Sequence, residues 1–165
     1  MKDQLRGVFE VELPDPPLEG RIEASIHEVG ETTEARIIGV EDAWEVDIDW
    51  YLWGALRRFI CGWWCVQVII DCMCDPCVVL QPDGRIPLDP CLVDENGQAH
   101  YHTTIYVPAG KVHPEPGECA EVCKVVIVVT YQDLCDRPGP IAGMVVGPLI
   151  QFYSEGDKAT STPTP

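Results

Sequence analysis

Residues 44–77 read WEVDIDWYLWGALRRFICGWWCVQVIIDCMCDPC and contain all five tryptophans and five of the nine cysteines. Over residues 44–52 apolar and polar residues alternate, which is the period of a strand with one buried face. The run at 61–71 is apolar on both sides, which is typical of a central strand with both faces covered. The stretch therefore predicts two core strands, joined by a polar connection at Arg57 and Arg58.

Shorter alternating runs flank this pair and are separated by turns rich in proline and glycine. These further strands are expected at residues 7–13, 21–29, 33–40, 77–80, 99–107, 122–131 and 141–153, with a loop at 86–90. The last strand should break or bulge at Gly143 and at Gly147-Pro148. About seven short strands at this spacing predict an all-β fold, an antiparallel β-sandwich of the immunoglobulin-like or transthyretin-like kind, rich in cysteine.

The length of 165 residues and the hydrophobic content of 46% are consistent with one domain that has a real core. We expect this single β-sandwich domain to span residues 1–153, with 1–20 as an N-terminal arm or edge strand. Residues 154–165, which end in ATSTPTP, are expected to form a disordered tail.

The chain is strongly acidic, with 27 Asp and Glu against 11 Lys and Arg and a net charge of −16. Phosphate backbones and anionic membrane surfaces repel such a charge, so we expect no nucleic-acid partner. No apolar run approaches the roughly 20 residues of a membrane span, so no membrane insertion is expected. The first residues, MKDQLRGVFEVEL, lack the apolar centre of a signal peptide.

Disulfide bonds are the first interpretation of the nine cysteines. If the run at 61–71 pairs antiparallel with 122–131, opposed residues have a constant sum of residue numbers. Sums of 195 or 196 predict the pairs Cys61–Cys135, Cys72–Cys123 and Cys77–Cys119, with Cys74–Cys91 as an extra bridge. An odd count leaves at least one free or intermolecular thiol. Disulfides indicate an extracellular or cell-surface protein, and the missing signal peptide leaves the cytoplasm as the alternative.

A metal site is the second interpretation of the cysteines. Cys72, Cys74 and Cys77 place three thiols within six residues, and Cys91 could supply a fourth ligand. A set of thiolates suits zinc or an iron–sulfur centre, or a redox role. Elsewhere His100 and His102 share one strand face, as do Asp47 and Asp49, and a solvated polar face is the simpler interpretation of both pairs. Buried free thiols are the third interpretation of the cysteines.

No nucleophile elbow, P-loop, dinucleotide-binding fingerprint or zinc-protease motif occurs in the sequence. Three aromatic side chains fall outside the expected core and suit protein contact or sugar stacking; these are Tyr51, Trp53 and Trp63. The apolar terminal strand at 143–153, which ends in Phe152 and Tyr153, could add to the sheet edge of a neighbouring subunit. We therefore expect a non-enzymatic structural or interaction module without a cofactor, which forms a homo-oligomer or binds another protein. The alternatives are a metal-binding or redox protein with zinc or an iron–sulfur centre, and a carbohydrate-binding module.

Overall fold

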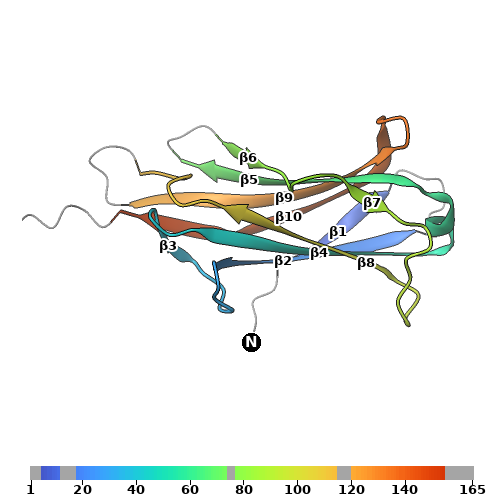
Figure 1. Cartoon of the computed structure of the whole chain (residues 1–165), viewed down its shortest axis with the longest axis horizontal. Helices are drawn as coiled ribbons and strands as arrows, with labels where there is room; N and C mark the ends of the chain where they lie inside the picture. Colours follow the sequence, from blue (N-terminus) through green and yellow to red (C-terminus); the bar gives the residue numbers. More distant parts are fainter. Residues whose placement is uncertain (1–4, 12–17, 74–76, 115–119, 155–165) are drawn as a thin grey trace, which may run out of the picture.

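The computed structural model describes residues 5–11, 18–73, 77–114 and 120–154 (Figure 1). Its strands are β1 (Leu5–Val11), β2 (Glu19–Glu28), β3 (Ile37–Gly39), β4 (Trp44–Trp53), β5 (Gly62–Cys72), β6 (Val78–Leu80), β7 (Ile86–Leu88), β8 (Ala99–Val107), β9 (Ala120–Asp133) and β10 (Pro138–Tyr153). One short 3-10 helix, η1 (Ala55–Phe59), connects β4 to β5. The protein is therefore all-β, as the sequence predicts.

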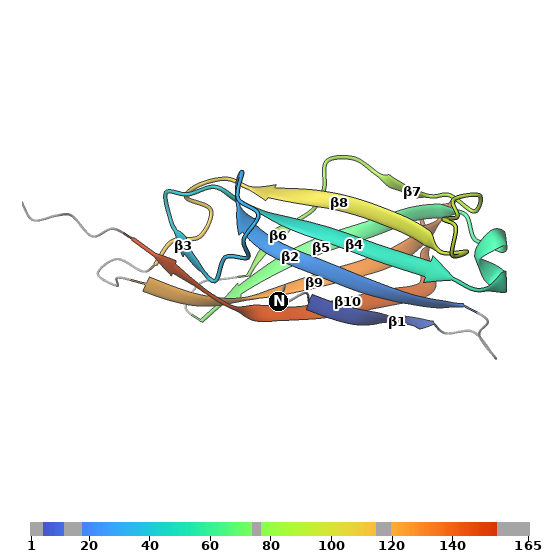
Figure 2. The ribbon, with the colours of Figure 1, turned by 90° about the horizontal axis from the view of Figure 1, so that it is seen from below.

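Eight strands form one nearly closed antiparallel sheet in the order β6-β5-β9-β10-β1-β2-β4-β8. The short strand β7 adds to β5, and β3 pairs with β10 in parallel. The sheet folds over, so that β2, β4 and β8 face β5, β9 and β10 (Figures 1 and 2). Strand β1 joins the two layers, because residues 5–8 pair with β2 and residues 9–11 pair with β10.

Aromatic rings fill the core where the two layers meet. The alternation of β4 buries every second residue, as predicted, and this places Trp50 inside. Trp50 stacks on Tyr101 of β8 with 5.6 Å between ring centroids, and it meets the edge of Trp64 of β5 at 5.9 Å. Phe9 of β1 lies 5.7 Å from Trp64, so β1, β4, β5 and β8 contribute to one aromatic cluster.

Strand β10 bulges between Val146 and Leu149, where the sequence predicts it. Because of the bulge, the inward-facing residues change from odd to even numbers along the strand. The break predicted at Gly143 is wrong, since this residue is paired on both sides with Phe9 and Val129. A Cβ atom there would lie 2.6 Å from Ile22 Cδ1, so the glycine makes room for core side chains rather than for a turn.

Two other expectations need correction. The loop predicted at 86–90 contains β7, which pairs with the start of β5. Strand β5 was expected to be covered on both faces, but only its inward residues are fully buried. The outward side chains of Trp63, Cys65 and Ile69 remain partly exposed, because the second layer packs against one face of the sheet only.

The connection between β4 and β5 is not simply a polar turn. The side chain of Arg57 in η1 is 4% exposed, whereas Arg58 is exposed. The Arg57 guanidinium donates hydrogen bonds to the carbonyls of Pro90 at 3.0 Å and Leu92 at 2.8 Å. Arg57 therefore ties η1 to the loop that follows β7.

Candidate functional site

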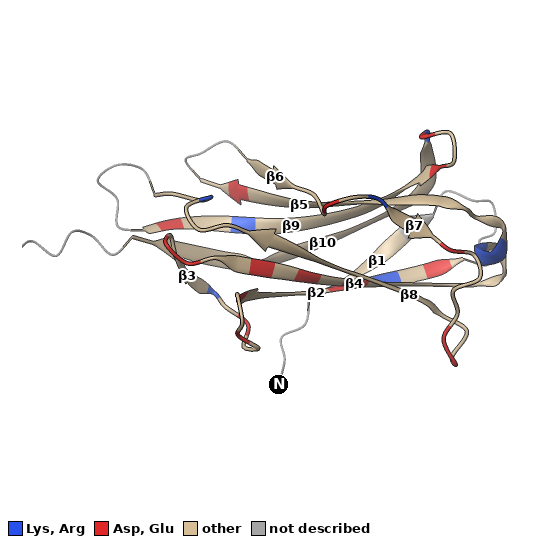
Figure 3. Cartoon of the chain, viewed as in Figure 1, with Lys and Arg blue, Asp and Glu red and all other residues tan. Residues whose placement is uncertain are grey.

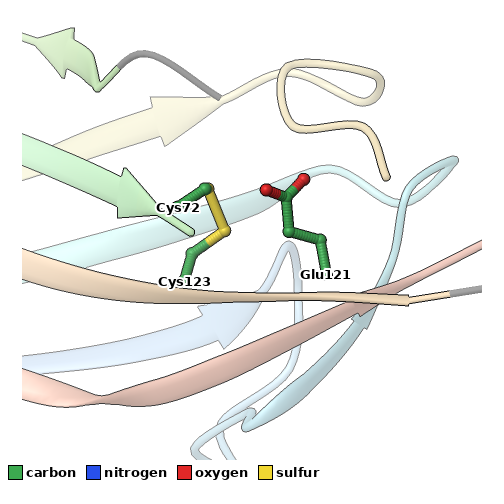
Figure 4. A group of neighbouring side chains, drawn as sticks. All are labelled: Cys72, Glu121 and Cys123. Carbon is green, nitrogen blue, oxygen red and sulfur yellow. A yellow bond between two sulfur atoms is a disulfide. The ribbon is translucent and has the colours of Figure 1, made fainter. Parts of the chain in front are cut away.

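A buried group of three ligand-type side chains lies at the end of β5 (Figure 4). Cys72 is the last residue of β5, and its partner in the register of β9 is Cys123. Their sulfur atoms form a disulfide across the two strands. Glu121 precedes Cys123 by two residues, so strand alternation places its side chain on the same inward face.

The carboxylate of Glu121 has no hydrogen-bond partner among the described residues, although Glu121 is only 4% exposed. A buried acceptor without a donor costs free energy, and such groups usually point to a water, an ion or a functional role. The neighbouring disulfide has no N–H or O–H group to donate. Glu121 is not among the residues expected from the sequence, because the strand was expected to start at Val122; its position two residues before Cys123 is the signal that places it on the same face.

We expect the Glu121→Met variant to be more stable than the wild type under non-reducing conditions. Methionine fills a similar volume without an unpaired acceptor, so the free energy of unfolding should rise by about 1–3 kcal/mol. Urea denaturation followed by tryptophan fluorescence measures this change. The control Glu41→Met, at an exposed position, should shift stability by less than about 0.5 kcal/mol. A loss of stability in Glu121→Met would contradict the assignment of an unpartnered carboxylate.

Of the predicted disulfides with both cysteines described, the structure contains Cys72–Cys123 and lacks Cys61–Cys135. The register explains the difference. Opposed residues of β5 and β9 sum to 195, and this pairing ends at Gly62 and Asp133. Position 61 would fall opposite Leu134 if the register continued, and Cys135 lies in the turn that follows β9. Cys61 and Cys135 are both exposed free thiols.

The remaining cysteines do not assemble as predicted within the described residues. Cys74 and Cys119 lie outside them, so the pairs that involve these two are not described. Cys77 and Cys91 are exposed free thiols, and they form no ligand group with Cys72 in the described part of the chain. Cys65 is free as well, and its partial burial raises the pKa of its thiol.

Cys77 and Cys91 should differ in reactivity although both are exposed. The Cys77 thiol donates a hydrogen bond to Asp71 Oδ1 at 3.2 Å, and this bond raises the pKa of the thiol. Less thiolate is then present at pH 8, so Cys77 should be alkylated by iodoacetamide more slowly than Cys91. Timed alkylation with peptide mass spectrometry measures both rates. In the variant Asp71→Asn the alkylation rate of Cys77 should increase, and the rate of Cys91 should not change. If Cys77 reacts at the same rate in the wild type and in Asp71→Asn, the role of Asp71 is contradicted.

The five aromatic residues predicted as interaction candidates do not share one surface. They are distributed over three strands: Tyr51, Trp53, Trp63, Phe152 and Tyr153. The prediction for Phe152 is wrong, since it is 1% exposed and packs against Trp44 with ring centroids 5.6 Å apart. The β10 bulge turns Phe152 inward, and Tyr153 is half-buried.

The three aromatic residues that face outward are partly covered by side chains of the same chain. Tyr51 and Trp53 lie on the outer side of β4, and Trp63 lies on the outer side of β5 in the other layer. The guanidinium of Arg21 lies 4.4 Å from the ring centroid of Tyr51, and that of Arg85 lies 5.5 Å from the Trp63 ring. Tyr51 and Trp53 therefore lie on one layer and Trp63 on the other, so the three rings do not form one platform.

The outer side of the layer formed by β6, β5, β9 and β10 is apolar. Ile69 lies opposite Val79 and Val126, and Val126 lies opposite Val146, so one row of apolar side chains crosses four strands. We call this surface the apolar face; its members are Ile69, Val79, Val122, Val126, Val128, Met144, Val146 and Leu149. Val79 is 52% exposed and Val146 is 47% exposed, so the row is open to solvent.

The outer side of the opposite layer carries charge instead. Asp49 Oδ1 lies 2.7 Å from His100 Nε2 and 3.2 Å from His102 Nδ1, and Thr104 donates its hydroxyl to Asp47 Oδ1 at 2.5 Å. These carboxylates have partners on their own sheet, which fits a solvated polar face better than a metal site. Figure 3 shows acidic residues along β4, whereas β10 carries no charged residue.

No protein-family model and no curated protein matches the sequence. In the part of the chain that the structure describes, no helix has the length and apolar character needed to cross a membrane. Two candidate sites emerge from the geometry: the buried group of Cys72, Glu121 and Cys123, and the exposed apolar face.

Proposed function

We propose that the protein is a non-enzymatic structural or interaction module, a disulfide-stapled β-sandwich domain of the immunoglobulin-like or transthyretin-like kind that associates with a second copy of itself. The observation that supports this proposal is the apolar row of Val79, Ile69, Val126 and Val146 on the outer side of one layer. Contiguous exposed apolar patches mark interaction surfaces. The disulfide between Cys72 and Cys123 is consistent with an extracellular or cell-surface location.

Charge favours a second copy as the partner at this surface. A net charge of −16 makes two chains repel each other over most approaches. On the outer sides of β5, β9 and β10, the charged residues described are Asp71 and Lys124, which are register neighbours. A two-fold arrangement can place Asp71 of one chain near Lys124 of the other, so this face is both the least repulsive and self-complementary.

Substitution of Met144 and Val146 by lysine tests the proposal. Both residues are exposed, so the variant Met144→Lys/Val146→Lys should fold like the wild type. At a closed interface the ammonium groups would be desolvated, and we expect the dimer dissociation constant to rise by about 100-fold. Lysine makes the net charge less negative, so weaker association cannot be attributed to greater overall repulsion. Sedimentation velocity over a concentration series measures the constant.

The matched control is Tyr106→Lys, which places lysine at an exposed site on the outer side of β8, in the opposite layer. This variant should associate as the wild type does. A wild-type chain that remains monomeric at concentrations on the order of 1 mM, the range of the weakest specific binding, would rule out self-association. Equal effects of Tyr106→Lys and the double variant would rule out the apolar face.

A further inference from the structure

The buried group at the end of β5 combines the donors that a thiophilic metal ion requires. One ligand atom each from Cys72, Cys123 and Glu121 lies within 4.8 Å of the others. All three residues are buried, with Cys123 fully inaccessible and Cys72 9% exposed. The three side chains project from adjacent positions of β5 and β9 into the same space (Figure 4).

The unpartnered carboxylate of Glu121 is an independent sign of a ligand. Neither oxygen has a hydrogen-bond donor among the described residues, and both are inaccessible to solvent. A buried carboxylate is normally paired with a cation or coordinates a metal. A cation bound between Glu121 and the two sulfurs would satisfy it.

We propose that reduction of the Cys72–Cys123 disulfide creates a zinc site formed by the two thiolates and the Glu121 carboxylate. A dithiol reductant transfers two electrons and two protons to the S–S bond, which yields two thiols and the oxidised, cyclic form of the reductant. Zinc then displaces one proton from each thiol and binds both sulfurs and one carboxylate oxygen. Thiolate ligands select zinc over calcium and magnesium, and water completes a four-coordinate site.

Disulfide and metal are mutually exclusive states of this site. In the oxidised chain the sulfurs are bonded to each other and the carboxylate alone faces them. In the reduced chain the metal replaces the covalent link between β5 and β9, so the two strands remain connected. The site lies on the inner side of the sheet and does not depend on self-association through the apolar face.

Cobalt titration of the full chain tests the proposal. The protein is reduced with excess dithiothreitol, desalted without oxygen and titrated with Co²⁺, whose thiolate charge-transfer absorption reports sulfur ligation; Zn²⁺ then competes. We expect the reduced protein to bind one Co²⁺ ion per chain with thiolate ligands, and the oxidised protein to show no such binding. Glu121→Gln should weaken zinc binding by at least about 10–100-fold, the loss that even an outer-shell partner causes. Cys72→Ser/Cys123→Ser should abolish the site, and the controls Glu41→Gln and Cys135→Ser should leave it unchanged.

A second measurement needs no variant. In the reduced wild type, zinc should slow alkylation of Cys72 and Cys123 and leave the rate at Cys135 unchanged. Wild-type affinity in Glu121→Gln, or protection of Cys77 and Cys91 instead of Cys72 and Cys123, would overturn the proposal and assign any metal to the exposed thiols.

Discussion

Removal of the disulfide in the variant Cys72→Ala/Cys123→Ala is expected to lower the free energy of unfolding by about 4 kcal/mol relative to the oxidised wild type. The bond links residues 51 positions apart in β5 and β9. Without the disulfide, the unfolded chain regains the conformational freedom of the segment between Cys72 and Cys123. The loss of about 4 kcal/mol follows from the chain-entropy relation for a loop of this length. Urea denaturation without reductant measures the difference.

Reductant provides the control for this variant. Dithiothreitol should destabilise the metal-free wild type by a similar amount and should not affect Cys72→Ala/Cys123→Ala. The exposed free thiols allow a second control, since Cys91→Ala and Cys135→Ala should each change stability by less than about 0.5 kcal/mol. A wild type whose stability is the same with and without reductant would show that the bond is not formed or does not stabilise the fold.

Trp50→Ala should be the most damaging single substitution in the core, with a loss of about 3–5 kcal/mol. Trp50 is fully buried and contacts Tyr101 in its own layer and Trp64 in the facing layer. Its indole N–H has no partner among the described residues, so the loss is one of packing rather than of a hydrogen bond. Chemical denaturation followed by circular dichroism measures it.

Trp53 supplies the matched comparison for Trp50. It lies on the outer side of the same strand, is half-buried and donates its indole N–H to Glu19 Oε2 at 3.0 Å. Trp53→Ala should therefore cost roughly 1 kcal/mol. Equal losses in the two variants would contradict the placement of Trp50 at the junction of the layers.

Local alternation explains why much of the fold was predictable. The strand expected at 99–107 matches β8, and the alternation from residue 44 matches β4. The covering of β5 was not predictable in the same way, because apolar residues on both sides of a strand do not specify what lies against them. The burial of Arg57 depends on carbonyls of Pro90 and Leu92 more than 30 residues away, and no local pattern reports such a contact.

The cysteine site was predictable in part for a related reason. A constant sum of residue numbers is enough to place Cys72 opposite Cys123, because two long antiparallel strands keep one register. The same sum misplaces Cys135 by one position, and strand pairing has ended there. To predict the inward position of Glu121, the start of β9 at Ala120 would have to be known. The ends of strands are the part of a sequence pattern that is hardest to place.

The position of β1 dictates when the fold can be completed. Its partners come from opposite ends of the chain, since Leu5 pairs with Ala24 whereas Phe9 pairs with Gly143. During synthesis β2, β4 and β8 emerge long before β10, so the edge of β1 that receives β10 stays unpaired until the ribosome has made Pro138–Tyr153. Pairing between such distant segments makes closure slow, and a nascent chain stalled before β10 would expose that edge to neighbouring chains.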